Sequence, residues 1–141
     1  MAERRVLIDT GPLVAVLSKD DGHHQACVEI LAVLPPPLLT CWPVLTEAAW
    51  LLRKQPGAVQ KLFEAFDAGL LELLSLEREA VAWIAKFMRR YETIGAQLAD
   101  AALVYLAERE NIRTVFTLDR RDFSVYRLKR NRALKLIPEI P

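Results

Sequence analysis

Four acidic residues stand alone in apolar stretches of this 141-residue chain, and they restrict its possible folds more than any other feature. An ionised carboxylate in apolar surroundings is costly unless another group pairs with it. The four are Asp9 after the run 6–8, Glu47 within 44–52, Asp100 within 97–107 and Asp119 after the run 115–118. If the fold brings them together, a divalent cation is their natural partner.

The order of the apolar patterns predicts an α/β fold. Short aliphatic runs without polar alternation are typical of buried parallel strands, whereas apolar residues three and four apart are typical of amphipathic helices. We expect strands at 5–9, 38–41, 70–76 and 114–118, with a fifth candidate at 134–137. We expect helices at 11–17, 23–34, 43–54, 58–68, 77–91 and 97–110. Strands that alternate with helices pair in parallel, with helices on both faces of the sheet. The length predicts a single domain over residues 1–141.

Positive charge is concentrated towards the C-terminus. Residues 1–110 carry 11 Lys/Arg and 15 Asp/Glu, for a net charge of −4, whereas residues 111–141 carry 8 and 3, for a net charge of +5. A basic tail on a nearly neutral chain indicates a polyanionic partner, although a solvated surface explains the charge equally well. If the partner is RNA, we expect backbone contacts from Arg120, Arg121, Arg127, Lys129, Arg130 and Arg132.

No pattern in the sequence predicts a membrane segment or a disulfide framework. Asp9 interrupts the first apolar run, so we expect no signal peptide. The longest uncharged stretch, 30–46, contains four prolines, which exclude a transmembrane helix. Cys27 and Cys41 are too few for a zinc site or a disulfide scaffold, so we expect both in the core of a cytoplasmic protein.

The four isolated acids are expected to meet at one edge of the sheet. Asp9 and Asp119 follow two strands directly, and ligands bind beyond the carboxyl ends of parallel strands. Glu47 and Asp100 lie about one turn from that edge on their helices. Oxygen ligands without His or Cys suit Mg²⁺ or Mn²⁺. A carboxylate site of this kind is suited to phosphoryl transfer.

Three further residues are candidate members of this site. Thr10, after the first strand, and Thr117, near the end of the strand at 114–118, each offer a hydroxyl group near the metal. Asp122, three residues after Asp119, is a candidate further ligand or holder of a metal-bound water. Each acid also has a simpler explanation as a turn, cap or surface residue; Asp122, for example, could cap a helix that begins at Phe123.

Five motifs, in this order, resemble PIN-domain ribonucleases, and most closely toxins of the VapBC type. The likeness extends from about residue 5 to residue 137. The motifs are Asp9–Ala15, Asp20–His24, Leu45–Ala48, Leu98–Leu103 and Thr117–Phe123.

The resemblance implies a three-layer α/β/α sandwich around a central parallel sheet of four to five strands. It also implies a Mg²⁺- or Mn²⁺-dependent endoribonuclease that forms a homodimer and has an antitoxin protein as partner. Asp9, Glu47, Asp100 and Asp119 match the acidic quartet of the family, and Asp122 matches an acidic position that varies. Gln97 stands where related sequences often have Asp, which favours one tightly bound metal over two.

Other functions fit parts of the pattern. The motif Asp9–Gly11 also occurs in aspartic proteases, but those are all-β proteins. A receiver domain phosphorylated on aspartate would need a lysine at a late strand end, and none stands there. An RNA-processing protein that is not a toxin, or a non-catalytic module that binds RNA or a protein partner, also remains open. Metal-dependent RNA cleavage would separate a nuclease from the non-nuclease alternatives.

The aromatic residues allow two predictions. Trp42, Trp50 and Trp83 are expected in the core, because large aromatic side chains are more often buried than used as platforms for bases. Tyr126, next to Arg127, is the better candidate for stacking on an RNA base.

Overall fold

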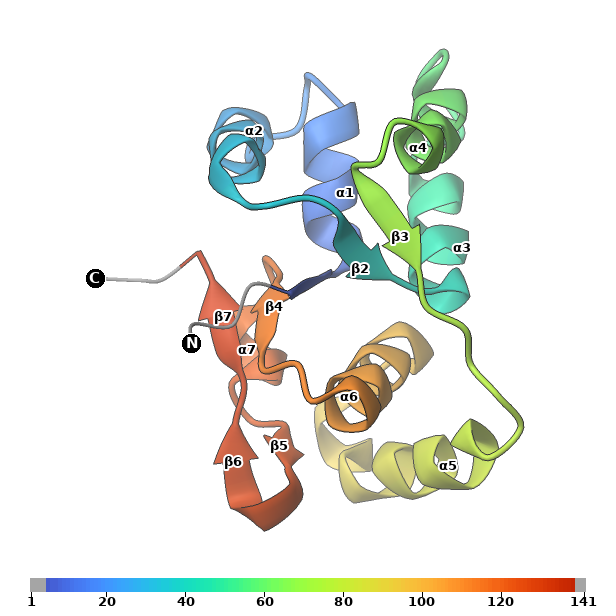
Figure 1. Cartoon of the computed structure of the whole chain (residues 1–141), viewed down its shortest axis with the longest axis vertical. Helices are drawn as coiled ribbons and strands as arrows, with labels where there is room; N and C mark the ends of the chain where they lie inside the picture. The colour runs from blue at the N-terminus through green and yellow to red at the C-terminus, as the bar shows by residue number, and fades with distance from the viewer. Residues whose placement is uncertain (1–4, 139–141) are drawn as a thin grey trace.

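Five short parallel strands form the centre of the molecule, which a computed structural model describes over residues 5–138 (Figure 1). They are β1 (Val6–Ile8), β2 (Leu38–Thr40), β3 (Leu71–Leu73), β4 (Thr114–Phe116) and β7 (Lys135–Ile137). Their order in the sheet is β3-β2-β1-β4-β7, and every neighbouring pair is parallel. The predicted α/β class and the fifth strand are therefore confirmed.

Helices cover both faces of this sheet. In Figure 1, α1, α2 and α4 lie above it, α5 and α6 lie below it, and α3 packs against both α1 and α6. Their bounds are α1 (Thr10–Leu17), α2 (His24–Val33), α3 (Trp42–Leu51), α4 (Ala58–Asp67), α5 (Ala80–Arg90), α6 (Leu98–Glu110) and the short α7 (Arg120–Phe123). The resulting three-layer α/β/α sandwich is the predicted architecture.

The register of β1 and β4 determines which residues meet at the carboxyl edge of the sheet. Ile8 lies opposite Phe116, and both strands are buried throughout because they occupy the middle of the sheet. The next residues along the two strands, Asp9 and Thr117, are therefore neighbours at the edge. Cys27 and Cys41 are fully buried, as expected.

The structure differs from the sequence-based expectation in its smaller elements. The expected strand at 70–76 has only three residues, because β3 is an edge strand that pairs with three-residue β2. A hairpin of β5 (Arg127–Leu128) and β6 (Arg132–Ala133) was not predicted. A tight turn, Lys129–Asn131, joins its strands. A 3₁₀ turn, Glu92–Ile94, follows α5.

The prediction that all three tryptophans lie in the core was wrong for two of them. Trp42 is 56% exposed and Trp50 is 63% exposed on α3, where the guanidinium of Arg53 covers the Trp50 ring at 3.6 Å. Only Trp83 packs partly against the core. The sequence of α3 does not reveal which of its apolar residues are exposed, because most of the helix is apolar and its neighbours in the fold bury only part of its surface.

Within residues 5–138, no helix combines the length and the apolar content that a bilayer crossing requires.

Candidate metal centre

The carboxyl edge of the sheet brings the predicted acids around one cavity of about 480 Å³. Asp9 follows β1 and Asp119 lies just beyond β4, while Glu47 comes from α3 and Asp100 from the first turn of α6. Asp122 of α7 and Thr10 of α1 also line the cavity. Residues that are up to 113 positions apart in the sequence thus share one site because β1 and β4 are adjacent strands.

A single threonine hydroxyl connects the two acids that follow the strands. Thr117 is fully buried, and its Oγ1 donates a hydrogen bond of 2.8 Å to Oδ2 of Asp9. The same oxygen accepts the backbone N–H of Asp119 at 3.0 Å. Thr117 therefore fixes the orientation of Asp9 and the backbone position of Asp119 together.

Asp119 also begins α7. Its Oδ1 accepts the backbone N–H of Asp122 at 3.1 Å, which is the hydrogen bond of a helix N-cap. The sequence left open that Asp122 caps a helix from Phe123, but the helix starts at Arg120 and Asp119 caps it. One carboxylate oxygen from each of Asp100, Asp119 and Asp122 lies within 4.8 Å of the others.

Asp100 is held by Tyr126, for which the sequence predicted a different role. The hydroxyl of Tyr126 donates to Oδ2 of Asp100 at 2.6 Å. Tyr126 is fully buried among aromatic rings, so the prediction that it stacks on an RNA base was wrong. A buried tyrosine usually needs a hydrogen-bond partner for its hydroxyl group, but the sequence alone does not identify Asp100 as that partner.

Burial and mutual repulsion raise the pKa values of these acids. Burial raises the pKa of Asp9 to about 7, and the charges of Asp100 and Glu47 add to this, although hydrogen bonds from the Thr10 backbone and Thr117 oppose it. Burial raises the pKa of Asp100 to about 6 against the hydrogen bond from Tyr126, with a further contribution from Asp119. Burial and Asp119 also raise the pKa of Asp122. Without a cation, protons neutralise part of the site near neutral pH.

Two residues at the start of α1 close one side of the cavity. The hydroxyl of Thr10 lies 3.5 Å from the carbonyl oxygen of Val44 and so points to α3, the helix that carries Glu47. A Cβ atom at Gly11 would approach the Leu118 side chain to 3.3 Å. The absence of a side chain at Gly11 lets the first turn of α1 approach the segment that leads to Asp119.

The six predicted RNA-contacting cations do not form one group. The side chain of Arg120 donates to the carbonyl of Pro138, and Arg132 lines a separate cavity with Arg113 and Lys135. Arg121 is exposed beside Asp122. The remaining three, Arg127, Lys129 and Arg130, line a cavity between α5 and the β5–β6 hairpin.

Comparison with known proteins gives consistent results. The family model of the PIN domain matches residues 6–129. Ribonuclease VapC26 of Mycobacterium tuberculosis (strain ATCC 25618 / H37Rv) is 30% identical over 124 residues, which cover 86% of this chain and 92% of VapC26. Among solved structures, VapC20 of Mycobacterium tuberculosis, a Sarcin-Ricin loop cleaving toxin, matches with a TM-score of 0.74 at 17% identity, covering 82% of this chain and 90% of VapC20. VapBC2 of Rickettsia felis, bound to a DNA fragment from its promoter, matches with a TM-score of 0.64 at 18% identity, covering 93% of this chain and 97% of the chain compared.

Proposed function

Because this chain belongs to the PIN-domain family, we propose that it is a metal-dependent endoribonuclease and the toxin of a toxin–antitoxin pair. The convergence of Asp9, Glu47, Asp100 and Asp119 around one cavity carries the proposal. The chain spans nearly the whole length of a ribonuclease relative, VapC26, which supports RNA as the substrate class.

The donor set of the site fits Mg²⁺ or Mn²⁺. It consists of carboxylate and hydroxyl oxygens, which hard divalent cations prefer. We propose that Asp9, Asp100 and Asp119 hold the cation, with Glu47 and Asp122 as further ligands. Gln97 lines the same cavity in place of a further acid, which supports a single tightly bound ion. When bound, such a cation polarises a phosphate oxygen and increases the acidity of water at the site.

The protein's own residues hold the carboxylates in place before the substrate arrives. Thr117 orients Asp9, Tyr126 orients Asp100, and the start of α7 orients Asp119. Groups fixed in this way need little rearrangement during the reaction, which is a large part of electrostatic catalysis. Asp9 and Asp100 must lose their protons when the cation binds, so we expect affinity for the cation to fall as the pH drops below about 6 to 7.

The nuclease is tested with purified protein and labelled single-stranded and structured RNA. Cuts should appear with Mg²⁺ or Mn²⁺ and disappear with EDTA. The products should carry 5′-phosphate and 3′-hydroxyl ends, because water rather than the ribose 2′-hydroxyl is the attacking group. Cyclic phosphate ends that persist in EDTA would overturn the metal-dependent mechanism.

The toxin role is tested separately from the nuclease. Induction of the parent protein in a bacterial host should arrest growth, whereas Asp119→Asn should not. Co-expression of an antitoxin encoded beside the gene should relieve the arrest. RNA cleavage without arrest would identify an RNA-processing enzyme that is not a toxin, and neither effect would identify a non-catalytic binding module.

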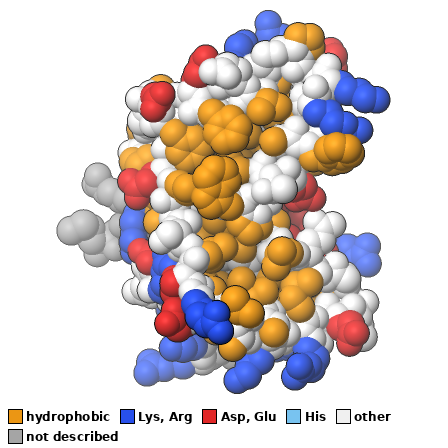
Figure 2. Space-filling view, turned by 90° about the vertical axis from the view of Figure 1, so that its right-hand side faces the viewer, with side chains coloured by type: hydrophobic (Ala, Val, Ile, Leu, Met, Phe, Trp, Pro, Cys, Tyr) orange, Lys and Arg blue, Asp and Glu red, His pale blue; other side chains and the backbone are white. Residues whose placement is uncertain are grey.

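An exposed apolar face supports the proposal of a homodimer. Figure 2 shows hydrophobic side chains gathered in a band on the face of the molecule that Figure 1 shows at its right. Trp42, Trp50 and Leu98 are each more than half exposed, and they line a cavity of about 490 Å³ that reaches Glu47. A second copy on this face would remove these side chains from water and would lie beside the acidic site.

A further inference from the structure

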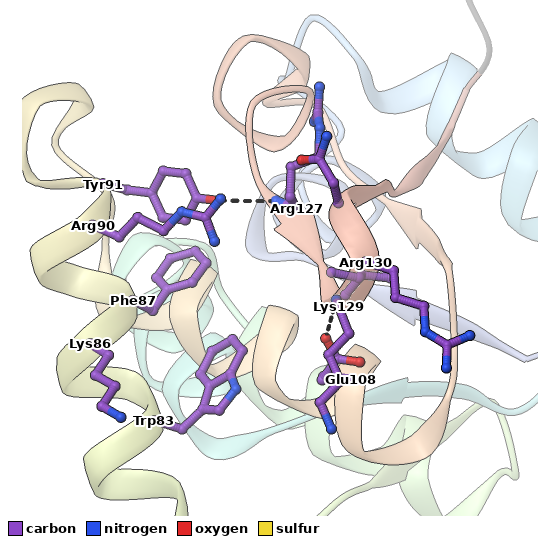
Figure 3. A pocket seen from close by; sticks show the side chains of 11 residues that line it. Trp83, Lys86, Phe87, Arg90, Tyr91, Glu108, Arg127, Lys129 and Arg130 are labelled. Carbon is purple, nitrogen blue, oxygen red and sulfur yellow. Dashed lines mark hydrogen bonds between the residues drawn. The ribbon is translucent and has the colours of Figure 1, made fainter.

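A cavity of about 350 Å³ lies between α5 and the β5–β6 hairpin, outside the acidic site (Figure 3). Its volume is within the range of ligand-binding pockets, about 300 to 1,000 Å³. Cations line it from both sides, and we call it the basic pocket. They are Lys86 and Arg90 of α5, Arg127 of β5, and Lys129 and Arg130 of the turn.

Within the described residues, these five charges have no carboxylate partner. None of the ion pairs found in residues 5–138 includes one of the five. The one acid in the lining, Glu108, accepts the backbone N–H of Lys129 at 2.5 Å and so anchors the hairpin to α6. The guanidinium of Arg127 donates to the carbonyl groups of Ser124 and Tyr126. A lining with five cations and one acid favours an anionic ligand.

Aromatic rings form one wall of the basic pocket. Trp83, Phe87 and Tyr91 line it from successive turns of α5 (Figure 3). Trp83 is half-buried and packs against two rings, Phe87 in a stacked contact and Tyr105 in a T-shaped contact, with ring centroids 5.6 Å and 5.4 Å away. A fixed, partly exposed indole beside several cations offers stacking for a base and charge for a phosphate, the two interactions that hold single-stranded nucleic acid.

The turn of the hairpin holds Arg130 in a backbone conformation that is unfavourable for arginine. Arg130 and Asn131 both have left-handed backbones, with φ of 61° and 59°. The N–H of Arg132 donates to the carbonyl of Lys129, so the two residues form the centre of a type I′ turn. Glycine or asparagine suits both central positions of such a turn, and arginine does not. Strain of this kind, at a position that lines a charged pocket, points to a use for the side chain.

The side chain of Tyr126 connects the lining of the basic pocket with the acidic site. The Tyr126 ring lies 4.9 Å from the rings of both Phe87 and Tyr91, and its hydroxyl donates to Asp100. The hydroxyl of Tyr91 accepts the backbone N–H of Arg127 at 3.1 Å, so the same rings also position the hairpin. Tyr126 therefore contacts both the lining of the basic pocket and an acid of the proposed metal centre.

We propose that the basic pocket binds one nucleotide of single-stranded RNA that flanks the bond to be cut, with its base on Trp83 and its phosphates on the five cations. The inference rests on the proposed function and extends it by naming a second contact region on the substrate. An acidic peptide would engage the cations but would gain little from Trp83, so the indole favours RNA.

The test measures RNA binding in an Asp119→Asn background, so that the RNA is not cut. Lys86→Gln with Arg130→Gly removes two pocket charges and keeps the hairpin, because glycine suits the left-handed position. Lys54→Gln with Arg89→Gln removes two charges outside the pocket as a matched control. Binding of a fluorescent ten-nucleotide RNA is followed by anisotropy over a range of salt concentrations, and thermal melts check that each variant folds.

The pocket variant should reduce the salt slope by about 1.4, which is 0.7 for each lost phosphate contact, and the control should leave it unchanged. Trp83→Leu should weaken binding roughly 5- to 150-fold with the salt slope retained, as expected for a lost base stack. Equal slopes in the pocket and control variants would overturn the proposal, as would tight binding of a poly-glutamate peptide that depends on the cations while RNA binding does not.

A failure of the basic-pocket proposal can be distinguished from a failure of the nuclease proposal. If the parent protein cuts RNA and the folded pocket variant binds it as the control does, the basic pocket is not a nucleotide site although the proposed function stands. If the parent protein binds RNA through the pocket but does not cut it with Mg²⁺ or Mn²⁺, the pocket stands and the nuclease proposal fails.

Discussion

The hydroxyl of Tyr126 donates to Oδ2 of Asp100 over 2.6 Å, and both groups are buried. The bond stabilises the ionised form of Asp100 and so opposes the rise of its pKa that burial causes. The ring of Tyr126 meanwhile packs against Phe87, Tyr91 and Phe123. A structural core residue therefore lowers the pKa of a carboxylate in the proposed metal centre, against the larger effect of burial.

Tyr126→Phe should raise the pKa of Asp100 further, because the hydrogen bond that lowers it is lost. The acid limb of a pH–rate profile measured in Mn²⁺ should then move to higher pH, and the protein should lose about 1 to 2 kcal/mol of stability. Tyr91→Phe is the matched control, since its hydroxyl contacts Arg127 and not Asp100. An acid limb that moves equally in both variants would show that Tyr126 does not act through Asp100.

Stability without metal should fall as the pH rises through the range 5 to 8. The folded-state pKa values of Asp9 and Asp100, about 7 and about 6, lie above those of the unfolded chain, so the folded state holds more protons in this range. The stability is present at low pH and is lost as the pH passes these values. Between pH 5 and pH 8, the loss from Asp9 alone is on the order of 3 kcal/mol.

Melting curves in EDTA and in saturating Mn²⁺, recorded between pH 5 and pH 8, check this dependence. With EDTA, the melting temperature should be higher at pH 5 than at pH 8. With Mn²⁺, the trend should reverse, because the cation binds the ionised acids of the folded state. The same trend in both buffers would contradict a buried carboxylate site that binds metal.

The sheet and the acidic site follow from the sequence because short-range patterns determine them. Val6–Ile8 and Thr114–Phe116 are apolar without alternation, which predicts buried parallel strands, and strand adjacency then brings Asp9 and Asp119 to one edge. The prediction needs only the rule that ligands bind at the carboxyl ends of such strands.

The contacts that depend on tertiary packing could not be predicted. The sequence shows that Tyr126 is aromatic and lies near cations, but only the fold buries it against α5 and directs its hydroxyl to Asp100. Trp42 and Trp50 are suited to a core, yet α3 lies at the end of the sheet and leaves them on the surface. The β5–β6 strands have two residues each, which is too short for a periodic signal.

Trp50→Glu should shift a homodimer to monomer, because it places a charge on the apolar face that Trp50 forms with Trp42 and Leu98. Light scattering after size-exclusion chromatography measures the mass in solution. Val33→Glu is the control, since Val33 is 80% exposed on α2 and does not line this cavity. A monomeric parent protein, or a Trp50→Glu variant that remains a dimer, would exclude this face as the interface.

Asp119→Asn should separate a metal-binding role of Asp119 from a purely structural one. The variant removes one charge from the acidic site, and it keeps the oxygen that caps α7 by accepting the N–H of Asp122. The negative charge of Asp119 raises the pKa values of Asp100 and Asp122, so its removal relieves repulsion in the metal-free fold. In EDTA, the variant should therefore melt at a higher temperature than the parent protein.

With saturating Mn²⁺, the difference in melting temperature between the variant and the parent protein should become smaller or change sign. The parent protein gains RT ln(1 + [L]/Kd) from the bound cation, and the variant gains less because it has lost a ligand. Nuclease activity should be absent from the variant in both buffers. If Asp119 served only as the cap of α7, the variant would lose a little stability with or without Mn²⁺, and Mn²⁺ would leave the melting temperature of the parent protein unchanged.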